Sequence, residues 1–184
     1  MRLLHDAGVF DLAVAADISA LTERATAATY YREGLTAEQV AANRRIVEIS
    51  AASALDAARN AHQRLSAAFV DETLAGYVIA TRHGDDDLEL DWLMVDPARH
   101  GGGVAAALMQ SGLDWLGPDR PLWLNVIRYN ARAIGFYRKF GFEIDPAAET
   151  THAVPHVIMR RPANYGRTCE AAGSLSYAAG SASA

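Results

Sequence analysis

The chain has a single cysteine and no long hydrophobic run. One thiol, Cys169, cannot form a disulfide framework within 184 residues, and this usage is typical of a reducing compartment. The first residues, Met1–Asp6, contain no apolar segment of the kind that a signal peptide needs. No stretch reaches the ~18 uninterrupted apolar residues of a membrane-spanning helix. We therefore expect a cytoplasmic protein that has no membrane partner.

The chain also has fewer basic than acidic residues. Lys and Arg together number 17 against 22 Asp and Glu, which leaves a net charge of −5. Because phosphate backbones bind basic surfaces, this balance argues against nucleic acid as the main partner. The same balance suits a cationic acceptor such as an amine.

The composition is otherwise that of one globular domain followed by a short tail. With 51% hydrophobic residues, a chain of 184 residues can form a single domain with its own core. From Ala163 onward Ala, Gly and Ser dominate, so we expect a domain over residues 1–162 and a tail over 163–184 that has little to bury. If the protein forms a homodimer, this tail would dock on the neighbouring chain through its large side chains, Tyr165, Leu175 and Tyr177.

Three consecutive glycines, Gly101–Gly103, lie between a predicted strand that ends at Val95 and a helix that begins at once. Glycines occur where the backbone turns tightly or approaches another group closely. A helix N-terminus adds unpaired N–H groups and the positive end of the helix dipole, which together bind anions, most often phosphate. The sequence therefore predicts a site for a phosphate-bearing cofactor.

Other kinds of glycine loop fit these residues less well. A P-loop requires Gly-Lys-Ser/Thr at the helix start, where this chain has Gly-Val-Ala over residues 103–105. A dinucleotide fingerprint, formally present as Gly-x-Gly-x-x-Ala over residues 101–106, needs its first glycine directly after the strand and an acidic residue at the end of the next strand. Here Asp96–His100 intervene, and Leu122–Val126 ends in Asn and Val. A glycine-rich turn without a ligand is the remaining alternative.

Two motifs, in the right order, resemble the signatures of the GNAT superfamily, the acetyl-CoA-dependent N-acetyltransferases. His100–Ala105 is similar to the (Gln/Arg)-x-x-Gly-x-(Gly/Ala) signature, with His100 where the family usually has Gln or Arg. Leu88–Pro97, before it, looks like the fourth strand of that family. Leu124–Phe142 is similar to the second signature, an Asn followed by a helix that carries a Tyr and ends in Gly-Phe. The resemblance covers roughly residues 9–161 and implies an α/β (α+β) GNAT fold, a mixed central sheet of about seven strands with helices on both faces.

The hydrophobic periodicity predicts elements in the order β-α-α-β-β-β-α-β-α-β-β, which matches this fold. Asp17 is expected to cap the first helix, Thr36–Gln39 forms a capping box for the second, and Asn130 caps the last. The first helix is expected to bury Ile18, Leu21 and Ala25, and the second to bury Val40, Ile46, Val47, Ile49 and Leu55. The expected strands are 9–15, 65–70, 73–81, 88–95, 122–126, 142–144 and 154–159, and the expected helices are 17–31, 36–60, 102–116 and one after Asn130.

The resemblance also implies which residues bind acetyl-CoA, the expected co-substrate. The loop amides bind the pyrophosphate, the strand around Leu93 pairs with the pantetheine amides, and a backbone N–H near Leu93 faces the thioester carbonyl. Asn130 matches the asparagine that binds the cofactor arm. The expected cofactor-binding residues are Leu93, Val95, His100, Gly101, Gly102, Gly103, Val104, Ala105, Ala106 and Asn130. For His100 an ordinary surface position is an equal alternative to a phosphate contact.

Tyr137 matches the tyrosine that in this family reaches the sulfur and acts as general acid. It lies seven residues after Asn130, two turns along the same helix face. The alternative role is that of a packing aromatic, because Phe136, Phe140 and Phe142 are expected in the core.

Glu89 and Asp91 are the candidates for the group that takes the proton of the amine. They lie two residues apart on one strand and project from the same face, whereas Trp92 has the opposite parity and is expected in the core. We expect Glu89 to be the base, with Asp91 as the alternative; a solvated strand face, or a reaction without a base, stays open. His152 and His156 have no further Cys or carboxylate partner, so we expect no metal.

These residues predict an N-acetyltransferase that moves an acetyl group from acetyl-CoA to a primary amine by direct attack in a ternary complex. The acceptor is a small molecule or a peptide. The competing hypothesis is a non-catalytic acyl-CoA-binding sensor or regulatory module with the same fold. Tyr137 and Asn130 argue against it, because a pure binder needs no acid at the sulfur.

Overall fold

A seven-stranded mixed sheet forms the centre of the molecule, in a computed structural model that describes residues 1–9 and 12–165. The strand order is β1-β2-β3-β4-β5-β7-β6, and only β4 and β5 pair in parallel. The strands are β1 (Arg2–His5), β2 (Gln63–Val70), β3 (Thr73–Arg82), β4 (Leu88–Val95), β5 (Leu122–Ile127), β6 (Glu143–Ile144) and β7 (His156–Arg161). The predicted mixed sheet with helices on both faces is confirmed.

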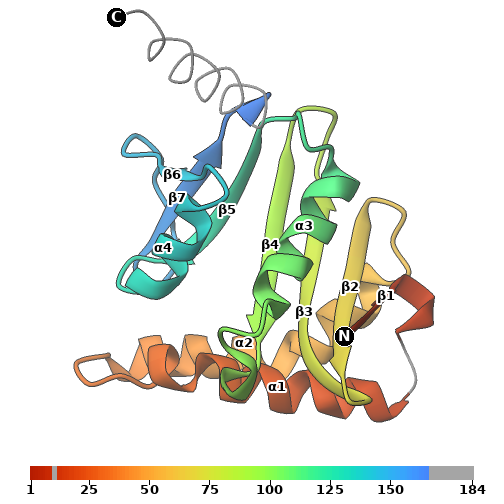
Figure 1. Ribbon diagram of the computed structural model, residues 1–184. Helices are drawn as coiled ribbons and strands as arrows, with labels where there is room; N and C mark the ends of the chain where they lie inside the picture. The colour runs from red at the N-terminus through yellow and green to blue at the C-terminus, as the bar shows by residue number, and fades with distance from the viewer. Residues whose placement is uncertain (10–11, 166–184) are drawn as a thin grey trace, which may run out of the picture.

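Two hydrophobic cores lie on opposite faces of this sheet. Helices α1 (Leu12–Tyr30) and α2 (Ala37–Ala57) close one core, and α3 (Val104–Leu116) and α4 (Ala131–Arg138) close the other, as Figure 1 shows. Helix α3 lies very close to the strands, because a Cβ at Gly112 would come within 2.7 Å of Leu90 Cδ1. Helix α3 begins at Val104, shortly after β4 ends at Val95, so the first turn of α3 lies beside the end of that strand.

The beginning of the chain differs from the prediction. The first strand is β1, which pairs antiparallel with β2, and the segment predicted as a strand over 9–15 enters helix α1 at Leu12. Asp17 therefore lies inside α1 and does not cap it. The cause is that a short apolar run fits both periodicities, and the alanines of this segment favour a helix.

Helix α2 confirms one prediction and corrects another. Its capping box is present, with Gln39 N donating to Thr36 Oγ1 at 3.2 Å and Thr36 N donating to Gln39 Oε1 at 3.0 Å. The predicted buried face of α2 is wrong. Ile49 is 39% exposed, and the buried residues are Asn43, Ser50, Ala54 and Ala57. Small side chains let α2 lie close to its neighbours, and the bulky aliphatic residues flank that contact.

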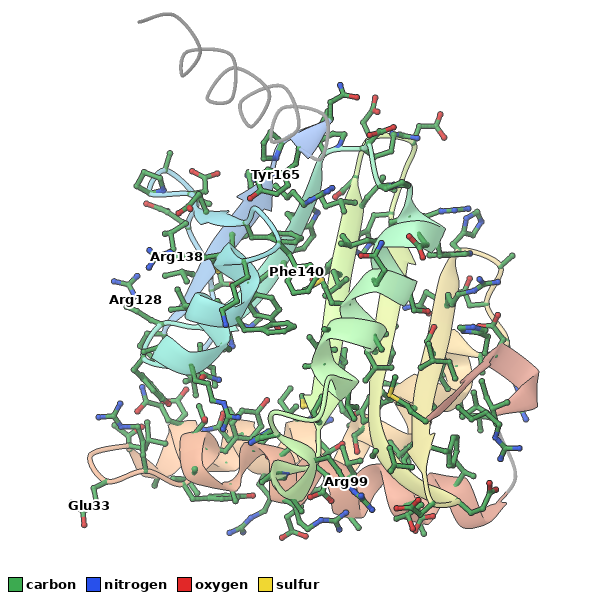
Figure 2. The ribbon with its side chains drawn as sticks, in the orientation of Figure 1. Glu33, Arg99, Arg128, Arg138, Phe140 and Tyr165 are labelled. Carbon is green, nitrogen blue, oxygen red and sulfur yellow. The ribbon has the colours of Figure 1, made fainter. Side chains whose placement is uncertain are left out.

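The C-terminal end of the described chain folds back on the domain. The Tyr165 ring fills the space beside Gly141, at the end of α4 (Figure 2), and the Arg161 guanidinium lies 5.3 Å from the centre of that ring. Leu175 and Tyr177 lie outside the described residues. Within residues 1–9 and 12–165, no helix has the length and apolar character that crossing a membrane requires.

Candidate active site

Strands β4 and β5 run apart after a single point of pairing. Their one bridge joins Glu89 to Trp123, and the rest of β4 up to Val95 has no partner on that edge among the described strands (Figure 1). An unpaired strand edge offers N–H and C=O groups to an extended ligand. Leu93 and Val95 both lie on this part of β4, where the sequence analysis expects pantetheine to bind.

The glycine loop follows at the end of β4 and opens α3. Gly101 and Gly103 have φ values of +82° and +80°, which favour glycine, and Gly103 is the N-cap of α3 without a side-chain cap. A Cβ at either position would meet no described atom within 4 Å. The N–H groups of residues 104–106 begin the helix and have no intrahelical acceptor. The loop thus presents unpaired N–H donors to open space, an arrangement that fits a phosphate-bearing group.

An ion pair holds this loop against α1. Asp96 Oδ2 accepts hydrogen bonds from Arg24 Nε at 3.0 Å and Nη2 at 2.7 Å, and Asp96 Oδ1 accepts one from Ala98 N at 2.9 Å. Arg99 ends the short 3-10 turn η2 (Pro97–Arg99) beside the loop, at the lower end of β4 in Figure 2. These contacts fix the position of the glycines relative to both helical layers.

His100 lies at the exposed rim of the loop. Partial burial lowers the pKa of its imidazole, and the positive charge of Arg132, in the first turn of α4, lowers the pKa further. The ring is therefore neutral at pH 7.

Asn130 caps α4, as predicted. Its Oδ1 accepts a hydrogen bond from Ala133 N at 3.1 Å. The cap uses the carbonyl oxygen, and the Nδ2 group is a separate donor that can serve a second partner. Capping and cofactor binding are therefore compatible at this residue.

Tyr137 is 7% exposed, and its ring belongs to the core on the α3 and α4 side of the sheet. The ring packs edge-on against Phe136 and Phe142, with centroids 5.6 Å and 6.3 Å away. Burial raises the pKa of its hydroxyl, and the nearby Asp91 and Tyr30 raise that pKa further. The packing role predicted as the alternative is present, and it does not compete with a chemical role for the hydroxyl.

Asp91 sits at a β-bulge of β4. Val78 pairs with Leu93 and Ala80 with Leu90, so Asp91 and Trp92 together oppose one residue of β3. The bulge interrupts the alternation of side chains along β4. Trp92 packs into the core between the sheet and α1, as predicted, but it lies on the same face as Asp91, so the predicted opposite parity is wrong. Burial, followed by the charge of Glu89, raises the pKa of Asp91 to about 8.

Glu89 is not part of a solvated strand face. It is 7% exposed, and its Oε2 lies 2.7 Å from His83 Nε2. Burial raises the pKa of Glu89, and the hydrogen bond with His83 offsets part of that effect. The His83 ring stacks on Trp123, whose Nε1 donates to Asp87 Oδ1 at 2.7 Å. Asp91, and not Glu89, is the carboxyl whose charge acts most on Tyr137.

The model of the Acetyltransferase (GNAT) family matches residues 27–142. The chain belongs to this family. An uncharacterized N-acetyltransferase from Mycobacterium tuberculosis is 44% identical over 79 residues, which are 41% of this chain and 49% of that protein. An uncharacterized N-acetyltransferase from Mycobacterium bovis matches equally, so the chain spans about half the length of these curated relatives.

Solved structures of GNAT proteins share the fold. The PaiA N-acetyltransferase from Thermoplasma acidophilum, in complex with coenzyme A, has a TM-score of 0.68 at 18% identity, over 88% of this chain and 99% of that one. The ribosomal-protein-S18-alanine N-acetyltransferase from Escherichia coli has a TM-score of 0.58 at 19% identity, over 88% and 94% of the two chains. At these identities the likeness is one of fold.

Three polar residues near the candidate site were not singled out by the sequence analysis. Tyr30, the last residue of α1, has its pKa raised to about 12 by burial, then by Tyr129 and Asp91. His83 contacts Glu89, and Asn125 lies on β5 with a buried carbonyl oxygen. Each is brought to the site by tertiary packing, and no local pattern marks it.

The two histidines considered as a metal pair do lie together, with ring centroids 4.4 Å apart. His156 Nδ1 donates to the Val154 carbonyl at 2.6 Å, and burial lowers the pKa of this ring. Among the residues that the structure describes, no group of three or more His, Cys, Asp or Glu side chains could hold a metal ion.

Proposed function

We propose that this GNAT chain transfers an acetyl group from acetyl-CoA to a primary amine in a ternary complex. The observation that carries the proposal is the divergence of β4 from β5, with the open glycine loop at the end of β4 and with Asn130 and Tyr137 on α4, which follows β5. The net charge of −5 suits a cationic acceptor.

The cofactor end of the site needs only backbone groups and one side chain. The amides of residues 101–106 take the pyrophosphate, the free edge of β4 from Leu93 to Val95 pairs with the pantetheine amides, and Asn130 Nδ2 adds a donor to the arm. Acetyl-CoA, when bound, supplies the activated acetyl group. The open space in front of Gly101 and Gly103 supports this fit.

The chemistry has a definite proton balance. An ammonium acceptor carries three N–H groups and the amide product carries one, so one proton goes to the leaving sulfur and one to solvent. Asp91 takes the first proton from the ammonium in its ionised form, which is populated as pH approaches its raised pKa of about 8. The backbone N–H near Leu93 stabilises the charge that develops on the carbonyl oxygen, and Tyr137 gives its hydroxyl proton to the sulfur. The new bond joins the amine nitrogen to the acyl carbon as the carbon–sulfur bond breaks.

A route for the second proton leads outward from Asp91. Asp91 and Glu89 share one face of β4, and Glu89 is hydrogen-bonded to His83, whose side chain is 43% exposed. We place Glu89 on this route, between the carboxyl that meets the amine and the imidazole that meets water. A binding module without catalysis has no use for such a chain of titratable groups.

An acceptor screen tests the proposal directly. We expect wild-type protein with acetyl-CoA to release free CoA thiol when primary amines are added. A regulatory binding module would bind acetyl-CoA and release no thiol with any amine.

The glycine loop gives a second test. Gly103→Leu is expected to weaken acetyl-CoA binding by at least tenfold, because the leucine side chain would occupy the open space in front of the loop amides and a left-handed φ is unfavourable for it. Calorimetry measures the affinity. Gly34→Ala is the matched control, since Gly34 has a φ of +86° and open space but lies in the turn between α1 and α2. Equal affinities for wild type and Gly103→Leu would contradict the proposed loop site.

His100 is expected to contribute to acetyl-CoA binding only at acidic pH, where its ring is protonated. Because its pKa is lowered, the ring is neutral at pH 7.5, and His100→Ala should then bind acetyl-CoA within about threefold of wild type. A phosphate stabilises the charged ring, so the affinity of wild type should increase as pH falls below the reference pKa of ~6.5. The variant should lack that increase. Parallel pH profiles in calorimetry would show that His100 makes no phosphate contact.

A further inference from the structure

An open groove of about 610 Å³ lies between the outer edge of the sheet and helix α3. Strands β1 and β2 form one wall and α3 forms the other, with side chains that include Leu3, His5 and Arg64 on the strands and Gln110, Asp114 and Trp115 on the helix. Strand β3 separates this edge from β4, and Figure 1 shows β1 and β5 on opposite sides of α3. The groove is therefore distinct from the divergence of β4 and β5, and its volume is typical of a small-molecule site.

The Arg64 guanidinium, on the strand wall, is held by two neighbours. Its Nε lies 3.4 Å from Asp6 Oδ2, and its Cζ lies 5.7 Å from the centre of the Trp115 ring. Asp6 is itself fixed, because its Oδ1 accepts a hydrogen bond from Leu65 N at 3.1 Å. Within the described residues, the two Nη groups of Arg64 have no hydrogen-bond acceptor. A guanidinium held in this way keeps a planar pair of donors that matches a carboxylate.

His5 adds a second donor to the strand wall. Its Nδ1 lies 2.9 Å from Ser66 Oγ, and Ser111 Oγ donates to the same oxygen at 3.0 Å. Because the Ser66 oxygen accepts from Ser111, its own hydrogen goes to His5 Nδ1, and the neutral ring carries its hydrogen on Nε2. His5 pairs with Ser66 across the two strands, and Arg64 lies two residues before Ser66 on the same face of β2. The donors of His5 and Arg64 therefore share one wall.

The helix wall carries the opposite charge. Asp114 is exposed, and its Oδ1 accepts a hydrogen bond from Gln110 Nε2 at 2.7 Å, one turn earlier in α3. Among the described residues no cationic side chain lies within 4.0 Å of Asp114, so Arg64 and Asp114 line one groove without pairing. Leu3 and Trp115 add apolar surface to the same groove. Separated charges of opposite sign, with apolar surface beside them, are complementary to a ligand that carries both charges.

We propose that this groove binds an α-amino acid zwitterion with an apolar side chain. The carboxylate binds to Arg64 and His5, and the ammonium binds to Asp114. The side chain of the ligand contacts Leu3 and Trp115. This site does not depend on the proposed acetyl transfer, because the amino acid is bound there without being acetylated.

Three probes of similar shape test the need for both charges. They are L-leucine, 4-methylpentanoate, which lacks the ammonium, and 3-methylbutylamine, which lacks the carboxylate. Calorimetry without acetyl-CoA measures their affinities for the wild-type protein. We expect leucine to bind at least tenfold more tightly than either of the other two, because each of them loses hydrogen bonds between charged groups.

Two variants test the two walls separately. Arg64→Met should weaken the binding of leucine and 4-methylpentanoate by at least tenfold and leave 3-methylbutylamine within about twofold of wild type. Asp114→Asn should weaken leucine and 3-methylbutylamine and leave 4-methylpentanoate unchanged. Arg59→Met is the matched control, because Arg59 is exposed between α2 and β2 and does not line the groove. Thermal melts check folding, and Asp114→Asn, at an exposed helix position, tests the site even if Arg64→Met does not fold.

Three results would overturn the amino acid site. They are no measurable binding of leucine, equal affinities for leucine and both of the other probes, and a leucine affinity that is the same in wild type, Arg64→Met and Asp114→Asn. Leucine is also a primary amine, so binding that weakens in Asp91→Asn and persists in Asp114→Asn would place it at the proposed acetyl-transfer site instead. If the expected pattern holds but no amine releases thiol from acetyl-CoA, the groove site stands and the proposed acetyl transfer falls.

Discussion

Replacing Tyr137 with phenylalanine is expected to lower acetyl-transfer turnover by ~10²–10⁴-fold and to leave the affinity for acetyl-CoA nearly unchanged, because a general acid acts on the transition state. The ring contacts with Phe136 and Phe142 persist in the variant, so its Tm should change little. Only the hydroxyl, whose pKa responds to Asp91 and Tyr30, is lost. Turnover is measured as free thiol release, and affinity by calorimetry.

Tyr77→Phe is the matched control for this experiment. Tyr77 is also a buried tyrosine whose pKa is raised by burial and by Tyr30 and Asp91, but it lies in the core between the sheet and α1, where its hydroxyl is 2.7 Å from Thr22 Oγ1. We expect Tyr77→Phe to lose about 1 kcal/mol of unfolding free energy with that hydrogen bond and to retain its turnover. If Tyr137→Phe turns over as fast as wild type, Tyr137 is a packing residue and the acid is elsewhere.

The elements that could be predicted from the sequence are those whose backbone conformation depends on residues close together in the chain. The three glycines, the capping box at Thr36 and the cap at Asn130 are local signals, and each lies where it was expected. The central strands lie where the sequence predicted them, and their predicted ends differ from the structure by at most two residues. The strand predicted over 9–15 failed because a few apolar residues among alanines fit a helix as well as a strand.

The candidate site could be predicted only in part, because half of it depends on contacts between distant segments. The loop and Tyr137 follow from motifs, whereas His83 reaches Glu89 across a hairpin and Tyr30 comes from α1. The β-bulge at Asp91 could not be predicted from the alternation of apolar and polar residues either, because the bulge changes the face of the sheet on which Trp92 lies. Periodicity assumes a regular strand, and functional strands often depart from it.

Replacing Asp91 with asparagine is expected to change both turnover and the pH dependence of stability. At pH 7 the variant lacks the group that takes the proton of the ammonium, so turnover should fall by about 10²-fold or more. The deficit should shrink toward pH 10, where the amine loses its proton without help. Glu89→Gln, placed further along the proton route, should lose less. Equal turnover of wild type and Asp91→Asn across this range would mean that no base is used.

The stability of the same variant should exceed that of wild type, by an amount that grows with pH. In the unfolded chain Asp91 ionises near its reference pKa of ~3.9, whereas in the folded protein its pKa is raised to about 8. Between these values the folded state holds a proton that the unfolded state has released, so the unfolding free energy of wild type falls as pH rises through this window. Asparagine does not titrate. The Tm gain of Asp91→Asn should be near zero at pH 4 and on the order of 3 °C or more at pH 8, the shift that ~1 kcal/mol gives in a domain of this size. A gain that stays constant from pH 4 to pH 8 in thermal melts would show that folding does not change the ionisation of Asp91 over this range, which contradicts a raised pKa for its carboxyl in the folded protein.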